Sequence, residues 1–470
     1  MNWTNLLSWK RLRDHRLRVL EPERPPWQID YDRLIFSSAF RRLQDKTQVF
    51  PLSGSDYVRT RLTHSLEVST LARTLGTRVG KTILDRHPET KALDGSPLAN
   101  SLTPADFGMI TSAAALAHDI GNPPFGHSGE DSIRHWFKSS PIAGKAATSL
   151  TSVQRRDFES WEGNAEAFRI IGRLQLYRED GGMRLTSATL GAFAKYPTAA
   201  SAVATKEERD DEKKKRSGNT ASLKKPGFFD HDALLWAEVV QELQLKPLGE
   251  GRWARHPLAF LTEAADDICY RIIDLEDGAR MGRISFSDLE ELLIAMIKPD
   301  DLKGLNRIPQ WEKLRRASFL RAKAISQAVE EVTSIFLDSE AKLLEGSFLG
   351  SLTDAAPINE HFKRIESITI DKIYSTRSVL EIEAAGFEIL PGLLDAFVGA
   401  VESLRDEQCP DRMKALKLSK LIPREFYEEE GVYWRDPYVR LLSIVDFVAG
   451  MTDSYALTLY RRLKGFSLPG

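Results

Sequence analysis

Apolar residues recur at intervals of three and four along most of this chain, and strict alternation of apolar and polar residues is rare. The helical spacing is clearest over residues 64–86, 128–138, 257–280 and 440–463. A period near 3.6 residues is typical of amphipathic helices, whereas a period of two is typical of strands. The exception, Ile365 to Tyr374, is predicted as a short strand or an edge hairpin. We therefore expect an all-α fold with at most a few short strands.

Proline and glycine residues indicate where two of the predicted helices begin and end. Pro257 fits the first position of a helix, and Gly278 fits the position that terminates it. A second, alanine-rich helix leads to His118 and Asp119, and we expect Gly121 to terminate it. Adjacent side chains within a helix diverge by ~100°, so the end of this helix would allow His118 and Asp119 to converge.

Asp266, Tyr270 and Asp274 recur at every fourth residue of the first of these two helices. This spacing places two carboxylates and a phenol on one helical face. Apolar residues flank the face, and we interpret Glu276 and Asp277 as the charges that face solvent. The face is therefore predicted to be functional rather than a solvated stripe.

Composition and charge narrow the class of protein. The 470 residues include 65 Lys or Arg and 67 Asp or Glu, so no overall field favours a nucleic-acid or membrane partner. Cys269 and Cys409 are far apart and show no disulfide or metal-knuckle spacing, which fits a reducing cytosol. No apolar run approaches ~18 residues, and the first residues lack the apolar core of a signal peptide. We expect a soluble, cytoplasmic protein without a membrane partner.

Four side chains of types that bind metals occur in the order His64, His118, Asp119 and Asp266. Two neutral imidazoles and two carboxylates suit Mn²⁺, Mg²⁺, Fe²⁺ or Zn²⁺ and leave coordination positions for water and phosphate oxygens. Asp267 is the second choice for the fourth ligand, because it points ~100° away from Asp266 on a helix. This order of residues predicts a metal site for hydrolysis.

Residues 76–82 resemble a phosphate-binding loop, but the pattern G-x-x-x-x-G-K-[ST] requires one more residue between its glycines. The segment also continues the helix that begins near His64 rather than following a strand. We therefore interpret it as helical and Lys81 as a surface lysine. Six further histidines have no predicted role in a site: His15, His87, His135, His231, His256 and His361.

Longer motifs surround the candidate ligands. They read RTRLTHSLEV at residues 59–68, AALAHDIGNPPFGHSGE at 114–130, FRRLQDKTQV at 40–49, EGN at 162–164, KYP at 195–197, AADDICY at 264–270 and GMTD at 450–453. In these motifs the chain resembles the HD-superfamily deoxynucleoside triphosphate triphosphohydrolases, the dGTPase-like enzymes. The matches run in order from about residue 30 to 455, so the resemblance covers nearly the whole chain.

The resemblance implies one large helical unit over residues 1–470, with an HD catalytic core at 30–280. Residues 281–470 are expected to complete the pocket and to make oligomer contacts. Residues 201–226 are rich in Lys, Glu, Asp, Ser and Gly, cannot bury enough apolar surface to become ordered, and are predicted to be a mobile insertion. The resemblance further implies a homo-oligomer, with a hexamer favoured, and leaves a dNTP activator and a single-stranded DNA effector open as partners.

The reaction implied by the resemblance is hydrolysis of a deoxynucleoside triphosphate, with dGTP favoured, to a deoxynucleoside and inorganic triphosphate, which would control dNTP pools. Mn²⁺ or Mg²⁺ is the expected cofactor, with Fe²⁺, Co²⁺ and Zn²⁺ as alternatives. Cleavage between the 5′-oxygen and the α-phosphorus expels a poor leaving group that needs a proton. His127, oriented by Glu130, is expected to act as the general acid or else as a nucleophile toward phosphorus.

The resemblance also assigns substrate contacts. The phosphates are expected to contact Arg61, Lys195, Tyr196 and Lys225. The deoxyribose is expected to contact Gln48, Tyr270 and Asp274, with Tyr270 excluding a 2′-hydroxyl. The substrate-binding set also includes Val49 and Asn164. Base contacts are expected within residues 381–387. At least one residue of the Arg41–Arg42 pair is predicted to be structural or phosphate-facing. Asn122 departs from the family pattern, because some relatives carry a histidine there.

Two other functions stay open. An HD phosphodiesterase or guanosine-tetraphosphate hydrolase would share the metal ligands but not Gln48, Lys195 or Tyr270. A catalytically weak nucleotide or single-stranded DNA sensor would normally have a broken metal motif, whereas all four ligands are present here.

Overall fold

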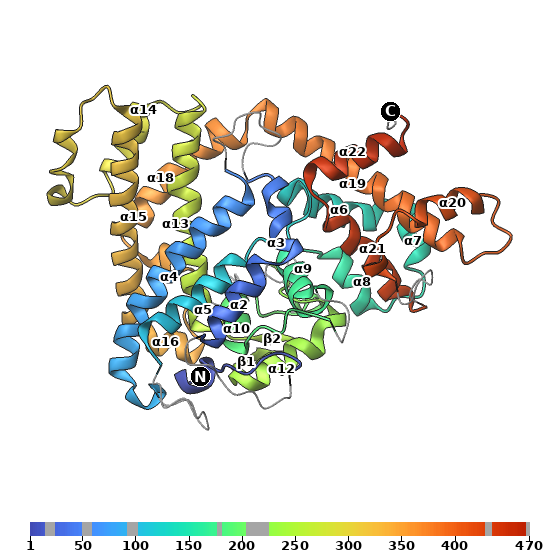
Figure 1. Cartoon of the computed structure of the whole chain (residues 1–470), viewed down its shortest axis with the longest axis horizontal. Helices are drawn as coiled ribbons and strands as arrows, with labels where there is room; N and C mark the ends of the chain where they lie inside the picture. The colour runs from blue at the N-terminus through green and yellow to red at the C-terminus, as the bar shows by residue number, and fades with distance from the viewer. Residues whose placement is uncertain are drawn as a thin grey trace.

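The computed structural model describes residues 1–14, 24–48, 59–91, 102–175, 181–203, 225–427 and 435–466 (Figure 1). Most of these residues are helical. Within the described ranges, strands β1 (Pro247–Gly249) and β2 (Arg252–Trp253) form a two-stranded antiparallel sheet. The predicted mainly helical fold is therefore confirmed. Residues 204–224, which make up most of the predicted insertion, lie outside the described residues.

The larger of two hydrophobic cores forms around three helices that pack against one another: α4 (Arg61–Arg86), α5 (Pro104–Leu116) and α13 (Pro257–Arg280). The other helices of this core are α1 (Trp3–Leu6), α2 (Pro26–Ile35), α3 (Ser38–Arg42), α9 (Gly163–Arg169), α10 (Ser187–Phe193), α12 (Ala233–Leu243), α14 (Phe286–Ile294), α15 (Lys313–Asp338), α16 (Glu340–Glu345), α17 (Leu352–Ala355) and α18 (Asn359–Thr369). In Figure 1, α13, α14, α15 and α18 lie side by side at one end of the molecule.

The second core joins the middle of the chain to its C-terminal part. Its helices are α6 (Gly126–Ser139), α7 (Pro141–Ala146), α8 (Ser152–Glu159), α19 (Arg377–Ser403), α21 (Pro437–Ala449) and α22 (Asp453–Leu463), and α20 (Arg412–Ser419) packs against α19. By length and composition α19 could cross a membrane, but half of its most apolar window is buried within the protein. The motif at residues 114–130 spans the end of α5, the turn at residues 117–125 and the start of α6, and so connects the two cores.

Glycines allow α4 and α5 to approach each other closely. A Cβ atom on Gly76 would lie 2.6 Å from the backbone oxygen of Phe107, and one on Gly80 would lie 2.7 Å from the ring of Phe107. Residues 76–82 are therefore part of a packed helix, which confirms that they do not form a phosphate-binding loop. Lys81 is exposed, as predicted.

The predicted C-terminal boundary of α13 is wrong. The helix begins at Pro257 as expected, but it continues to Arg280 and does not end at Gly278. Gly278 is buried, and a Cβ atom there would lie 2.5 Å from the Cδ1 atom of Ile373. This glycine serves close packing between helices rather than helix termination.

The predicted end of α5 is wrong as well. The helix ends at Leu116, and residues 117–121 form a turn. Gly121 instead touches α9, because a Cβ atom there would lie 2.2 Å from the carbonyl oxygen of Gly163. The region 440–463, predicted as one helix, is divided into α21 and α22 by residues 450–452. The early end of α5 leaves His118 and Asp119 on irregular backbone, where their side chains can converge.

Residues 365–374 were predicted as a strand, and the structure shows that this prediction is wrong. They belong to α18 and to a π-helical turn at Ile370–Tyr374. The buried residues of this segment, Phe362, Ile365, Thr369 and Ile373, are spaced by three or four positions. Burial of one helical face has therefore outweighed the strand preference of β-branched residues.

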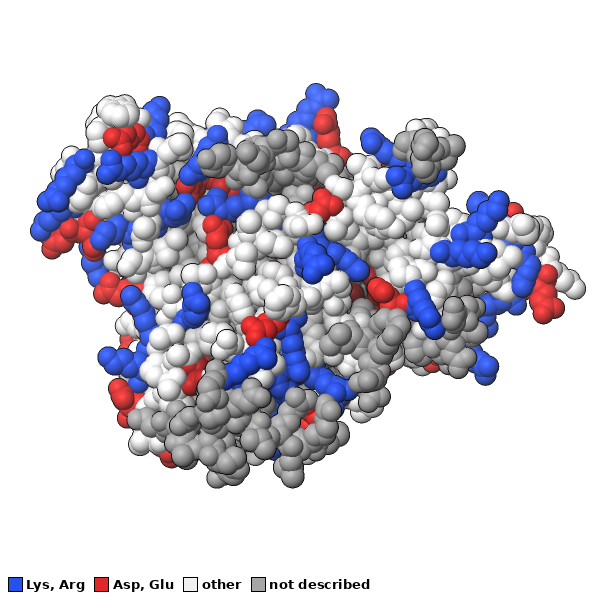
Figure 2. Space-filling model, in the orientation of Figure 1, with Lys and Arg blue, Asp and Glu red and all other residues white. Residues whose placement is uncertain are grey.

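Glu276 and Asp277 are buried and do not face solvent as predicted. Glu276 accepts hydrogen bonds from Arg280 and Arg321, and Asp277 accepts one from Arg59. These arginines compensate the buried carboxylates. Other charged residues cover the surface, and on the face drawn in Figure 2 basic and acidic side chains are interspersed.

Candidate active site

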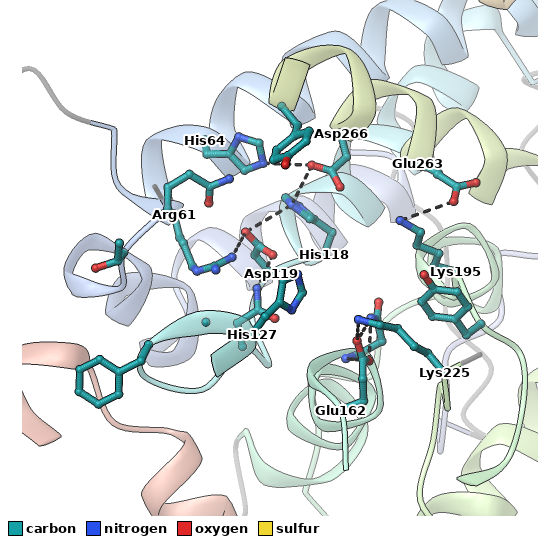
Figure 3. Close-up of a pocket in the computed structure, with 18 of the residues that line it drawn as sticks. Arg61, His64, His118, Asp119, His127, Glu162, Lys195, Lys225, Glu263 and Asp266 are labelled. Carbon is teal, nitrogen blue, oxygen red and sulfur yellow. Dashed lines mark hydrogen bonds and ion pairs between the residues drawn. The ribbon is translucent and has the colours of Figure 1, made fainter. Parts of the chain in front are cut away.

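A cavity of about 540 Å³ opens between α4, the turn after α5, the start of α6 and α13 (Figure 3). Most of the predicted site residues line it: Gln48, Arg61, His64, His118, Asp119, His127, Asn164, Lys195, Tyr196, Lys225, Asp266 and Tyr270. Glu130 and Asp274 are buried behind this surface and support residues that line it. Val49 lies outside the described residues.

The four predicted metal ligands converge on one wall of the cavity. The atoms of His64, His118 and Asp119 that could bind a metal lie within 4.8 Å of one another. Asp266 joins them from α13, because its Oδ1 lies 3.1 Å from His64 Nε2 and 3.6 Å from His118 Nε2. Two imidazoles and two carboxylates thus lie together, and these donor types suit a divalent metal ion.

Hydrogen bonds around this cluster orient the ligands for a metal ion. Nδ1 of His118 lies 2.7 Å from the carbonyl oxygen of Ala115, which can only accept. Nδ1 therefore donates, and Nε2 presents its lone pair to the cluster. Asp119 accepts hydrogen bonds from Arg61, at 2.8 Å, and from the side-chain amide of Asn122. The donor set and its orientation fit a divalent metal.

Both carboxyl groups of the cluster are held in the ionised form. Burial alone would raise the pKa of Asp119, but the charges of Arg61 and His118 outweigh it and lower this pKa to about 2. Burial would also raise the pKa of Asp266, but His118 and His64 lower it below its usual range. Ionised carboxylates are the form that binds metal.

A strained turn places His127 in the cavity. Phe125 adopts a left-handed backbone conformation with φ of 65°, and α6 begins at the next residue. His127 Nδ1 lies 3.1 Å from Glu130 Oε2, and the imidazole remains 78% exposed. Burial alone would raise the pKa of Glu130, but its hydrogen bond with His127 and the charge of Lys225 lower it to about 2. The carboxylate therefore accepts from Nδ1–H and leaves Nε2 to face a ligand.

Two lysines face the metal cluster from the opposite side of the cavity (Figure 3). Lys195 Nζ lies 3.5 Å from Glu263 Oε1, and Lys225 Nζ donates to Glu162 Oε1 at 2.6 Å. Burial alone would lower the pKa of each lysine, but Glu263 raises that of Lys195 and Glu162 raises that of Lys225. Both lysines stay charged at neutral pH, so this side of the cavity presents two ammonium groups, each paired with carboxylates.

Two tyrosines stack at one end of the cavity. The rings of Tyr270 and Tyr374 are nearly parallel, at 4°, with centroids 5.9 Å apart. Tyr374 Oη donates to Asp274 Oδ2 at 2.6 Å, and burial raises the pKa of Asp274 to about 7. Asp274 therefore holds Tyr374 against Tyr270, which lies one helical turn after Asp266 on α13.

Gln48 contributes an unpaired polar group to the cavity. Its Oε1 atom is buried and has no hydrogen-bond partner among the described residues. A buried acceptor without a partner is costly, so this oxygen is suited to receive a donor from a ligand. Unlike Gln48, Asn164 has a partner for its side chain within the protein, because its amide nitrogen donates to both carboxylate oxygens of Glu162, at 2.8 and 3.0 Å.

Among the cavity residues that were not predicted from the sequence, Glu162, Glu263 and Tyr374 make the polar contacts described above. Glu263 could have been found, because it precedes Asp266 by three residues and so shares its helical face. Glu162 lies in the quoted EGN motif. Tyr374 carried no signal, because its segment was predicted as a strand. Arg42 is structural and contacts the backbone oxygen of Gly450 at 3.3 Å, and none of the described histidines without a predicted role lines the cavity.

Comparisons with known proteins agree with this geometry. Residues 61–180 match the HD domain, a metal-dependent phosphohydrolase fold, and residues 352–462 match the phosphohydrolase-associated domain. The chain is 42% identical to a deoxyguanosinetriphosphate triphosphohydrolase-like protein of Synechocystis sp. and 37% identical to one of Pseudomonas aeruginosa, each over 100% of both chains. It is 28% identical to the deoxyguanosinetriphosphate triphosphohydrolase of Klebsiella pneumoniae over 98% of this chain and 99% of that protein. The chain belongs to the deoxyguanosinetriphosphate triphosphohydrolase-like family of HD-domain proteins.

Proposed function

We propose that this protein hydrolyses deoxynucleoside triphosphates, with dGTP preferred, to a deoxynucleoside and inorganic triphosphate. The observation that carries the proposal is a single cavity with a metal-ligand cluster on one wall, two charged lysines on the other and His127 between them. The preference for dGTP follows the names of the relatives.

His64, His118, Asp119 and Asp266 would hold one divalent cation, for which Mn²⁺ or Mg²⁺ is proposed and Fe²⁺, Co²⁺ and Zn²⁺ are alternatives. When bound, the cation supplies Lewis acidity and a water of lowered pKa for attack on phosphorus. Arg61 donates to Asp119 and lies beside the same point, so it can also stabilise the charge of a phosphoryl oxygen.

The outer phosphates would lie between Lys195 and Lys225. Lys195 pairs with Glu263, and Lys225 pairs with Glu162 and Glu130, so the lysines are held in place before a ligand arrives. A fixed cation loses little conformational freedom when it binds phosphate. Tyr196 lines the same side of the cavity and is placed to donate its hydroxyl to a phosphate oxygen.

The leaving deoxynucleoside needs a proton at its 5′-oxygen. Glu130 accepts from Nδ1–H of His127, so a protonated imidazole would present Nε2–H to the cavity. We propose that this N–H donates to the leaving oxygen, which is general acid catalysis. The same position would also permit nucleophilic attack on phosphorus by Nε2, and a substrate whose leaving group needs no proton distinguishes the two roles.

The sugar would lie against the stacked tyrosines. A 2′-hydroxyl would meet the ring of Tyr270, which Tyr374 prevents from moving away. Gln48 Oε1 is a free acceptor for a sugar hydroxyl. Asp274 already accepts a hydrogen bond from the hydroxyl of Tyr374. Its predicted contact with the 3′-hydroxyl would require the carboxylate to accept from both hydroxyls.

The product distinguishes this function from the other HD reactions. Purified protein with Mn²⁺ and dGTP should produce tripolyphosphate and deoxyguanosine, with no pyrophosphate or orthophosphate at early times. Phosphorus NMR separates these products, and a sample with excess chelator is the control. Pyrophosphate with a nucleoside monophosphate would overturn the proposal. A guanosine-tetraphosphate hydrolase would leave dGTP intact and cleave the tetraphosphate instead.

Replacing Tyr270 with alanine should admit ribonucleotides, because it removes the ring that blocks a 2′-hydroxyl. We expect the ratio of kcat/KM for dGTP to that for GTP to fall by ~10-fold or more, since steric discrimination by a packed group is worth about 1–3 kcal/mol. Tyr270→Phe keeps the ring and is the matched control, with a ratio close to that of the wild type. An unchanged ratio in the alanine variant would remove Tyr270 from the sugar site.

A cytoplasmic location follows from this proposal, because dNTPs are the substrate. The homo-oligomer, the dNTP activator and the single-stranded DNA effector stay predictions.

A further inference from the structure

Asp453 joins two segments of the site that are far apart in the sequence. Its side chain is buried at the start of α22. Oδ1 accepts from the backbone N–H of Phe125 at 3.0 Å. Oδ2 accepts from the backbone N–H and the hydroxyl of Thr47, at 3.0 and 2.6 Å. One carboxylate thus binds a segment from each of two walls of the cavity.

Each of these segments carries a predicted functional side chain. Phe125 precedes His127 by two residues, and Thr47 directly precedes Gln48. Phe125 has a left-handed backbone, a conformation that persists only where the surroundings hold it. Asp453 itself does not line the cavity, and neither do the other residues of the GMTD motif at 450–453. The motif therefore acts on the site through these hydrogen bonds.

Lys46 strengthens the same connection. Its buried ammonium donates to the backbone oxygens of Asn122, at 2.5 Å, and of Ala449, at 3.2 Å. Lys46 and Asp453, which are both buried, therefore connect the turn before His127, the segment before Gln48 and the junction of α21 and α22. This junction belongs to the part of the chain that matches the phosphohydrolase-associated domain.

We propose that Asp453 is a positioning residue that holds His127 and Gln48 in the relative positions that catalysis requires. The proposal rests on the function assigned to His127 above. A carboxylate that accepts three hydrogen bonds from two segments fixes their separation, whereas a residue that accepts from one segment would not. The C-terminal region thereby contributes to the reaction without a contact to the substrate.

Hydrogen exchange tests the connection independently of activity. Asp453→Ala should lose protection in peptides that cover residues 40–48 and 122–130, while peptides from α4 keep theirs. Asp436→Ala is the matched control, because Asp436 accepts from two backbone N–H groups at the start of α21 and lies away from the cavity. The Asp436→Ala variant should leave the peptides that cover residues 40–48 and 122–130 protected. Unchanged protection in Asp453→Ala would overturn the proposal.

Kinetics test whether the connection serves catalysis. Asp453→Ala should keep its Mn²⁺ and lower kcat for dGTP by ~10²-fold, the effect of a displacement of about 1 Å. Asp453→Asn keeps one accepting oxygen, so its kcat for dGTP should lie between those of the wild type and Asp453→Ala. In a His127→Ala background the same change should cost much less than ~10²-fold, because only the part that acts through Gln48 remains and the effects of coupled residues are not additive.

Equal losses in the two backgrounds would show a merely structural role and overturn the proposal. Wild-type protein that leaves dGTP intact would instead overturn the proposed function, and the exchange measurement would still decide whether Asp453 holds the two segments.

Discussion

Replacing Asp266 with alanine should release the metal and abolish dGTP hydrolysis. Asp266 brings its Oδ1 within 3.6 Å of both imidazoles and is the ligand that α13 contributes to the cluster. Loss of a direct ligand should cost more than the ~10–100-fold in metal affinity that is usual for outer partners of a ligand. Elemental analysis of dialysed protein measures Mn²⁺ per chain, and product assays at several Mn²⁺ concentrations measure activity.

The matched control is Asp267→Ala. Asp267 is the adjacent carboxylate on the same helix, but it accepts from Thr353 and pairs with Arg271. This variant should keep its metal. Full occupancy in Asp266→Ala, or loss of metal in Asp267→Ala alone, would show that the fourth ligand is wrongly assigned.

Replacing His127 with alanine should lower kcat by ~10²–10⁴-fold, the usual range for a lost general acid, while the metal remains bound. His127 is exposed in the cavity and makes no contact with the four ligands among the interactions of the described residues. His135→Ala is the control, because His135 is an exposed histidine of the same helix that does not line the cavity. A kcat of His127→Ala within ~3-fold of the wild type would exclude His127 from the chemistry.

A modified substrate separates the two roles of His127. dGTP with sulfur in place of the bridging 5′-oxygen has a leaving group that needs no proton. If His127 is the general acid, His127→Ala should hydrolyse this analogue nearly as fast as the wild type does. If His127 is a nucleophile, the variant stays slow with both substrates, and an alkaline quench of the wild type should trap a phosphorus–nitrogen bond.

Residue types and local spacing were enough to predict much of the site. The adjacent pair His118–Asp119 and the shared face of Asp266 and Tyr270 follow from short stretches of sequence, and the family resemblance added the pairing of His127 with Glu130. Helical periodicity similarly predicted the positions of α4, α6 and α13. These are local properties, because a side chain four residues away on a helix has a defined position.

The predictions that were wrong depended on contacts between residues that are distant in the sequence. Gly278 and Gly121 were interpreted as helix terminators, but each is required by a close neighbour, Ile373 in one case and Gly163 in the other. The segment at 365–374 was assigned from its β-branched residues, although the burial of one face made it helical. Glycine is compatible both with a helix end and with close helix packing, and β-branched residues are compatible both with a strand and with a helix. The packing of the neighbouring helix decides which of these structures forms.

The sequence by itself therefore determined the helical class, because the helical period acts within a few positions, and it predicted the candidate metal ligands from the order of their residue types. The contact between His64 and Asp266, which are 202 positions apart, belongs to the tertiary structure. Only the tertiary structure decided that Tyr374 stacks on Tyr270, that Glu276 and Asp277 are buried, and that Asp453 holds the segments of Thr47 and Phe125. These contacts join residues 104 to 406 positions apart or depend on which face of a helix is covered. Such proximity is set by how the two cores pack, and no local pattern in the chain specifies it.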